Sequence, residues 1–195
     1  MPPTGLPLAP GDHGPDVSSY QPNTDWVAVS GAGYTFAFVK ATEGTNYVNP
    51  EFARDWQQMA ASGLVRGAYH FGRPDVNSAQ AEVDWFLSHV SFQGNDIAVL
   101  DLEVGNGDLK DWTIAFGNSL LQNKMLYSGV PFMREHNLDN AEVAAAFNNK
   151  LWIAAYQQST PQLPNGWTEL TFWQHTDRQD VPGVQGACDC SVHRP

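Results

Sequence analysis

The chain has 195 residues and 42% of them are hydrophobic, which is enough for one large domain with a real core and argues against disorder. Its formal net charge is -11, and this disfavours a nucleic-acid partner, because such affinity comes from Lys and Arg neutralising phosphates. No run of about 18 apolar residues occurs, so the sequence predicts no membrane span.

The first 13 residues are rich in Pro and Gly and predict a flexible leader, followed by one domain over residues 14–195. This leader lacks the charged start and the apolar stretch of a secretory signal. Two origins therefore stay open: a chain made in the cytoplasm, or a secreted chain from which a leader has been trimmed.

Eight short runs with β-strand character follow the leader. Several are apolar on both faces, as strands are when they are buried on both sides of a parallel sheet. The runs are PDVSSY (15–20), TFAFVKAT (35–42), VRGAYHF (65–71), DIAVLDLE (96–103), KMLYSG (124–129), LWIAAY (151–156), LTFWQHT (170–176) and ACDCSVH (187–193).

Amphipathic helical patterns lie between the earlier runs, over residues 50–63, 78–90, 108–123 and 139–149. The late connections, 157–169 and 177–186, are short and contain Pro and Gly, so they have no room for a crossover helix. The sequence therefore predicts an α/β fold: an irregular TIM-like (β/α) barrel of eight strands with helices missing or reduced in the last third. The rival, an open doubly wound sheet, usually has a Gly-rich phosphate loop after the first strand, and none occurs here.

The two cysteines, Cys188 and Cys190, flank Asp189 in the last run. Two cysteines cannot form a disulfide scaffold, and their spacing on a strand is awkward for a bond between them. No Cys or His cluster has zinc spacing, so we predict two half-buried strand side chains, no metal site and no cofactor.

Asp101 and Glu103 end the fourth run, after the apolar segment IAVL and before a Gly-rich exit. Alternation on a strand sends both side chains to one face, with Cα atoms about 6.6 Å apart. In βα barrels this end of a strand carries catalytic side chains. Two close acids in a low-dielectric site cannot both ionise without a large electrostatic cost. One protonated and one ionised carboxyl is what cleavage of a glycosidic bond requires. The alternative is a pair of surface acids at a strand end.

Other acids occupy matching positions. Asp16 lies in the first run and Asp189 in the last, and these two strands are neighbours in a closed barrel. Glu43 follows the second run and is either a groove residue, a solvated loop acid or a partner of Lys40. His70 is more typical of a hydrogen-bonded core residue than of a catalytic base.

The ordered set of motifs resembles the glycoside hydrolase family 25 lysozymes, the Chalaropsis-type N-acetylmuramidases. The resemblance covers most of the chain from about residue 14. Its motifs are DVSSYQ (16–21), FVKATEGTNYVNPEF (38–52), GAYHF (67–71), VLDLE (99–103), MLYSG (125–129), LWIAAY (151–156), FWQHT (172–176) and PGVQGACDCS (182–191). Asn49, His175, His193 and the cysteine pair around Asp189 depart from the family's pattern, and the last two of these departures weaken the placement of the eighth strand.

The resemblance implies hydrolysis of the β-1,4 bond between N-acetylmuramic acid and N-acetylglucosamine in peptidoglycan. It implies Glu103 as general acid, Asp101 as partner carboxylate, and Asp16 and Asp189 as further catalytic acids. The side chains that it implies along the sugar groove are Tyr69, Tyr127, Trp152, Tyr156 and Trp173, to which we add Glu43.

Two other functions remain as alternatives: a non-catalytic peptidoglycan-binding barrel and a chitinase-like hydrolase. The expected partner is the glycan strand of the bacterial wall, approached by a monomer that acts outside the cell or on the wall. A phage endolysin made in the host cytoplasm and a trimmed secreted enzyme explain the sequence equally well.

Overall fold

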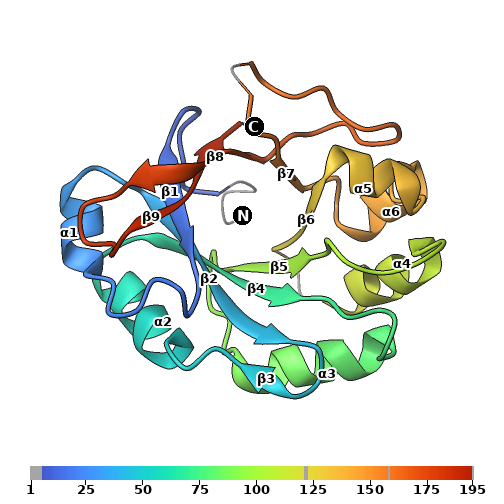
Figure 1. Cartoon of the computed structure of the whole chain (residues 1–195), viewed down its shortest axis with the longest axis horizontal. Helices are drawn as coiled ribbons and strands as arrows, with labels where there is room; N and C mark the ends of the chain where they lie inside the picture. The colour runs from blue at the N-terminus through green and yellow to red at the C-terminus, as the bar shows by residue number, and fades with distance from the viewer. Residues whose placement is uncertain (1–5, 121–122, 158, 195) are drawn as a thin grey trace.

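The computed structural model describes residues 6–120, 123–157 and 159–194. Within these residues the chain forms one nine-stranded sheet that closes into a barrel (Figure 1). The strands are β1 (His13–Val17), β2 (Phe36–Glu43), β3 (Tyr47–Val48), β4 (Val65–Phe71), β5 (Ile97–Asp101), β6 (Lys124–Gly129), β7 (Leu151–Ala154), β8 (Phe172–Asp180) and β9 (Ala187–His193). The eight predicted strands are confirmed; β3, a two-residue strand outside the barrel, was not predicted.

The barrel closes because β1 pairs with both β2 and β9. From β1 through β2 and β4 to β8 every neighbouring pair is parallel, whereas β9 is antiparallel to β8 and to β1. The sequence predicted parallel strands in an irregular barrel, and β9 departs from that parallel order. Residues 181–186 are too few for a crossover, so the chain turns back as a hairpin.

Helices cover the outside of the barrel along the part of the chain that precedes β7 (Figure 1). They are α1 (Trp26–Gly31), α2 (Phe52–Ala61), α3 (Ala79–His89), α4 (Lys110–Ser119), α5 (Val130–Glu135) and α6 (Ala141–Ala146). The described residues after β7 contain no helix, which confirms the predicted loss in the last third. Sequence patterning missed α1, although Asp25 caps it by accepting hydrogen bonds from Val27 N and Ala28 N, and it missed α5.

Strand alternation divides the buried side chains into two groups. One face of each strand packs against the helices, as Ala37 and Val39 of β2 do. The other face fills the barrel interior with a second cluster: Phe36, Phe38, Ile97, Val99, Met125, Tyr127, Trp152 and Phe172. The interior is thus a packed floor of aromatic and aliphatic side chains, above which polar side chains can be held.

Two glycines make room for the large side chains of this floor. A Cβ on Gly14 would lie 2.3 Å from the ring of Phe36, and one on Gly67 would lie 2.1 Å from the ring of Phe38. Because β1 and β4 flank β2, each glycine lets a phenylalanine from β2 lie across its strand.

The expected leader, residues 1–13, is described from residue 6, and residues 1–5 lie outside the described residues. Leu6 and Leu8 pack against the interior cluster. The Gly11 N–H donates to His193 O at 3.0 Å, and His193 N–H donates to Asp12 O at 2.8 Å. The described part of the leader is therefore attached to the barrel through β9, and β1 begins at His13.

His70 is a core residue, as its sequence context indicated. Its ring is fully buried, with Nδ1 2.8 Å from Thr42 Oγ1 and Nε2 2.8 Å from Glu82 Oε2. Glu82 also accepts hydrogen bonds from the Arg73 backbone N–H and from Asn77 Nδ2. This buried network joins α3 to the end of β4.

Candidate active site

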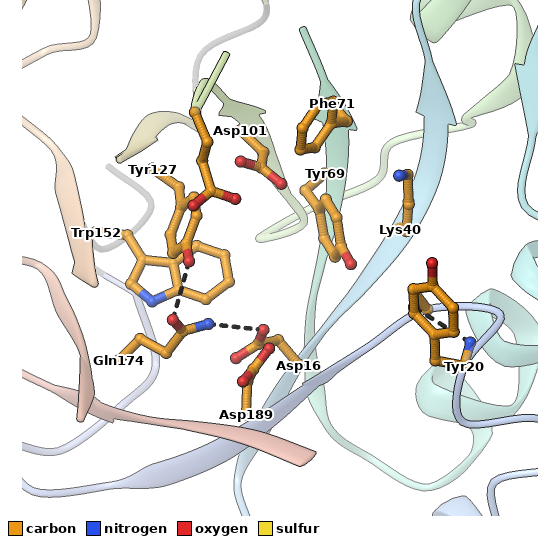
Figure 2. A pocket seen from close by; sticks show the side chains of 12 residues that line it. Asp16, Tyr20, Lys40, Tyr69, Phe71, Asp101, Tyr127, Trp152, Gln174 and Asp189 are labelled. Atoms are coloured by element: carbon orange, nitrogen blue, oxygen red, sulfur yellow. Dashed lines mark hydrogen bonds between the residues drawn. The ribbon is translucent and has the colours of Figure 1, made fainter. Parts of the chain in front are cut away.

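A pocket of about 210 Å³ opens above the aromatic floor and holds all four acids singled out in the sequence. Asp16 comes from β1, Asp101 ends β5, Glu103 follows two residues later, and Asp189 lies in β9. Figure 2 shows Asp16, Asp101 and Asp189 converging on one space from separate strands. The structure therefore brings together residues that are far apart in the sequence.

Asp101 and Glu103 form an interacting pair of carboxyls that both line the pocket. Burial and then the charge of Glu103 raise the pKa of Asp101 well above its usual range. Burial also raises the pKa of Glu103, although the hydrogen bond from Asp101 opposes this rise. Asp101 is only 6% exposed whereas Glu103 lies at the exposed mouth, so burial opposes the charge of Asp101 more strongly than that of Glu103.

Asp16 and Asp189 make a second pair, because they are direct partners across β1 and β9. Burial and the nearby Asp189 raise the pKa of Asp16 well above its usual range. Burial raises the pKa of Asp189 as well, and the hydrogen bond from Asp16 limits that rise. The pocket therefore contains two pairs of neighbouring carboxyls whose pKa values are all raised above the ordinary range.

Gln174 of β8 connects the acids to the aromatic side chains. Its Nε2 donates to Asp16 Oδ1 at 2.9 Å, and its Oε1 accepts from Tyr127 Oη at 2.9 Å and from Tyr156 Oη at 3.0 Å (Figure 2 draws the first two). Sequence reasoning missed Gln174. The alternation Phe172, Gln174 on the inward face of β8 was the signal that could have found it.

Lys40 is the one cation among the described residues that line the pocket. Its Nζ lies 2.6 Å from Glu43 Oε2 and 4.7 Å from the centre of the Phe71 ring. Its charge lowers the pKa of Asp101 and of Glu103 against the larger effect of burial. Glu43 pairs with Arg73 as well as with Lys40, and it holds Lys40 in place. Glu43 itself is not among the residues that line the pocket.

Aromatic side chains form the rest of the pocket wall: Tyr20, Tyr69, Phe71, Tyr127 and Trp152. Trp152 stacks on Phe38 with ring centres 4.2 Å apart, and its Nε1 donates to Ser191 Oγ at 2.9 Å. Tyr69 Oη donates to Val17 O at 3.2 Å. Tyr20 is 88% exposed at the rim, as a side chain that stacks on a sugar face would be.

Two of the aromatic residues expected along the groove, Tyr156 and Trp173, are not among the residues that line this pocket. Tyr156 is 56% exposed and reaches the site through its hydroxyl contact with Gln174, without lining the pocket. Trp173 points to the opposite side of β8, packs in the outer core cluster and donates from Nε1 to Ala155 O at 2.7 Å. Its placement follows from alternation, because Gln174 takes the inward position.

This arrangement suits acid catalysis on a glycan. A carboxyl with a raised pKa can donate a proton to a leaving oxygen, and ionised neighbours stabilise a developing positive charge. Flat aromatic walls give the sugar rings apolar surfaces.

Comparison with known proteins places these features in a family. The model of glycosyl hydrolases family 25 matches residues 15–184. The protein YegX of Escherichia coli strain K12, which is described as uncharacterized, is 38% identical over 195 residues, covering 92% of this chain and 68% of YegX. The N,O-diacetylmuramidase of Chalaropsis is 29% identical over 198 residues, covering 91% of this chain and 93% of the enzyme.

The structural neighbours agree with the sequence relatives. The crystal structure of a bacterial lysozyme from Streptomyces coelicolor superposes with a TM-score of 0.83 and 29% identity, covering 95% of this chain and 93% of the other. Relatives that match also include a lysozyme of Lactococcus phage mv1. The barrel and the four convergent acids agree with these matches, which show that the chain belongs to glycosyl hydrolases family 25 and is a glycoside hydrolase.

Proposed function

We propose that this chain is a lysozyme that hydrolyses the β-1,4 bond between N-acetylmuramic acid and N-acetylglucosamine, with Glu103 as general acid and Asp101 as partner carboxylate. The observation that carries the assignment is the Asp101–Glu103 pair. Both carboxyls line the pocket, burial raises the pKa of both, and the charge of Glu103 raises the pKa of Asp101 further. Relatives named lysozyme and muramidase support the bond and the substrate class.

The exposed position of Glu103 explains how the proton reaches the substrate. A glycan in the groove removes water from Glu103, which raises the cost of its charge and draws the shared proton from Asp101. Glu103 then donates this proton to the leaving oxygen. Asp101, now ionised, orients the acetamido group of the sugar whose bond is cleaved, so that its oxygen can assist at the anomeric carbon.

Asp16 and Asp189 act electrostatically in this proposal. The transition state is oxocarbenium-like, with positive charge at the anomeric carbon. An ionised carboxyl from the Asp16–Asp189 pair stabilises that charge, while the proton held by the pair limits the repulsion in the empty pocket. Tyr20, Tyr69, Tyr127 and Trp152 supply the surfaces on which the sugars rest.

The test is the Glu103→Gln variant with peptidoglycan as substrate. Loss of the proton donor should lower the rate by about 10²- to 10⁴-fold, while binding to sedimented walls stays unchanged. Mass spectrometry of the soluble muropeptides measures both the rate and the bond, because cleavage at this bond leaves N-acetylmuramic acid at the reducing end. Asp84→Asn, which changes an exposed acid on α3, is the control and should retain full activity. Unimpaired turnover by Glu103→Gln would remove this residue as the proton donor.

The same experiment separates the two alternatives. A binding barrel would sediment with walls and release no reducing ends from either protein. A chitinase-like enzyme would release sugar from soluble chitin at least as fast as it clears a wall suspension. The site of action that we propose is the bacterial wall, reached by a monomer. A phage endolysin and a secreted enzyme remain two settings for it, and size-exclusion chromatography with light scattering tests the monomer.

No helix in the described ranges has the length and apolar character needed to cross a bilayer.

A further inference from the structure

Three potential metal ligands meet on the outer face of the barrel wall, on the side away from the acid pocket. They are His13 of β1, Cys190 of β9 and His175 of β8, and their ligand atoms all lie within 4.8 Å of one another. The three strands are adjacent, with β9 between β1 and β8 (Figure 1). Sequence spacing predicted no metal site, because strand pairing alone brings these residues together.

Strand alternation explains why the three side chains face outward. Gly14, Asp16 and Asp189 face the interior, so His13 and Cys190 take the opposite face. On β8, Gln174 faces the interior and pairs with Ser191, and the register shifts before Thr176, which pairs with Cys190. This irregularity places His175 beside Cys190.

This face is open because the last third of the barrel has no covering helix. A pocket of about 300 Å³ lies here, and its walls are formed by the three ligands and by Ala32, Gly33, Tyr34 and Gln179. The space admits an ion with a bound water or a small ligand in a fourth position. His13 is exposed at the pocket's edge, whereas Cys190 is 2% exposed.

His175 supplies a second observation that points to a ligand. Its Nε2 is buried and has no hydrogen-bond partner. A buried polar nitrogen without a partner costs about 1–3 kcal/mol, and such atoms in folded proteins usually indicate a missing partner. The Cys190 thiol is also weakly bonded, since its hydrogen bond to Ser191 O has a length of 4.0 Å.

We propose that His13, His175 and Cys190 form a metal-binding site on the outer wall of the barrel. The ion that we expect there is zinc, a divalent ion of borderline softness. Two imidazole nitrogens and one thiolate sulfur are a donor set that zinc accepts in tetrahedral geometry, with water in the fourth position. Calcium and magnesium are excluded by chemistry, because they require oxygen ligands. Binding exchanges the thiol proton of Cys190 for the metal and releases that proton to solvent.

The position of the site gives it a structural consequence. Each ligand lies within three residues of a side chain inside the acid pocket: His13 near Asp16, Cys190 next to Asp189, and His175 next to Gln174. A bound ion would therefore fix together the three strands that carry Asp16, Gln174 and Asp189. It takes no part in the proton transfer at Glu103.

The test uses the full chain with cobalt as a spectroscopic probe and zinc as a competitor. Cobalt bound to a thiolate gives a sulfur-to-metal charge-transfer band, which carboxylates in the acid pocket do not give. We expect this band to saturate at one equivalent of cobalt and to disappear when zinc is added. Zinc at about 100 times its Kd should raise the Tm by about 5–10 °C.

Variants locate the site. Cys190→Ser should abolish the charge-transfer band, and His13→Ala and His175→Ala should each weaken zinc binding by at least about tenfold. Cys188→Ser is the matched control, because Cys188 is a buried thiol two residues away on the same strand and outside the ligand group. It should bind as the wild type does. Absence of the band in wild type, or an equal loss in Cys188→Ser, would overturn the proposal.

Discussion

The amide of Gln174 is the contact on which the geometry of the Asp16 carboxyl depends. It donates to Asp16 and accepts from two tyrosine hydroxyls, so three strands and the loop after β7 meet at one side chain. The hydrogen bond from Gln174 also lowers the pKa of Asp16, opposing the effects of burial and of Asp189. Gln174 is thus a positioning residue that acts through Asp16 and Tyr127.

Gln174→Leu should lower kcat by about 10- to 100-fold, because a hydrogen bond to a charged group contributes about 1.5–3 kcal/mol. The variant should also shift the acidic limb of the pH–rate profile upward, since Asp16 then holds its proton to a higher pH. Steady-state rates on wall fragments across pH measure both effects. Tyr156→Phe is the matched control. Tyr127 still donates a hydrogen bond to Gln174 in this variant, so the variant should lose little activity. Equal losses in the two variants would contradict the role given to Gln174.

The buried acids should reduce the stability of the fold at neutral pH. The pKa of Asp101 is raised well above its ordinary value of 3.8, so the folded state binds this proton more tightly than the unfolded chain does. Stability is then highest below the unfolded pKa and falls as pH rises from there towards the folded pKa. This cost is what the catalytic role proposed for Asp101 would account for.

Asp101→Asn should therefore raise the Tm at pH 7 while it abolishes activity. The gain should shrink as the pH falls towards 4, because the carboxyl in the unfolded chain, with its ordinary pKa of 3.8, then begins to take up a proton as well. Thermal unfolding of both proteins at a series of pH values measures this difference. Asp84→Asn, at an exposed acid, should show no such pH dependence. A gain for Asp101→Asn that is the same at pH 4 and pH 7 would show that charge is not the cause.

At the scale of the strands, the floor of the pocket depends on glycines that leave space for aromatic rings. Gly67 lies opposite Phe38 in the pairing of β2 with β4. Gly67→Ala should destabilise the fold by about 1–3 kcal/mol, because the added Cβ would meet the Phe38 ring in a packed interior. Urea unfolding measures the change. Gly31→Ala is the control, since nothing lies within 4 Å of its Cβ position, and it should be neutral or slightly stabilising.

Three of the predicted strands coincide with the observed strands at both ends. The run 187–193 matches β9 residue for residue, and the runs 65–71 and 124–129 match β4 and β6. Short elements were missed, because α1 and α5 have six residues each and show less than two turns of periodicity. Trp26 and Val29 are the two buried residues of α1, too few for a pattern.

The candidate site was predictable to the extent that strand ends show which residues converge. Asp101 and Glu103 were found from alternation, and Asp16 and Asp189 from the neighbouring positions of the first and last strands. Which aromatic side chains face the groove depends on the register of each strand. Trp173 was assigned to the groove by motif, whereas the structure turns Gln174 inward in its place. A shift of one residue exchanges the two faces.

At the scale of the whole molecule, the hairpin of β8 and β9 is what makes the four-acid pocket possible. A parallel last strand would need a crossover that residues 181–186 cannot provide. The antiparallel return brings Asp189 opposite Asp16 and leaves the outer wall at His13, His175 and Cys190 without a helix. The absence of a crossover helix between β8 and β9 thus explains both the second carboxyl pair and the open outer pocket.

The net charge of -11 makes a prediction about the rate on intact walls. Bacterial walls are anionic, so long-range repulsion opposes the approach of this chain, whereas short-range stacking and hydrogen bonds hold the glycan once it is in the groove. The Debye length falls from about 30 Å at 0.01 M to about 8 Å at 0.15 M salt, which screens the repulsion and leaves the contacts in the groove intact. The clearing rate of a wall suspension should therefore rise from very low to moderate ionic strength.

Surface charge can be changed apart from the site to test this. Asp84→Asn combined with Glu135→Gln removes two exposed acids that do not line the pocket, and this variant should be faster than wild type at low salt and equal to it at moderate salt. An uncharged soluble glycan cleaved by the same protein provides the comparison, since its rate should hardly depend on salt. A rate on walls that falls steadily from low to moderate salt would mean that local attraction near the groove, where Lys40 lies, outweighs the charge of the whole molecule.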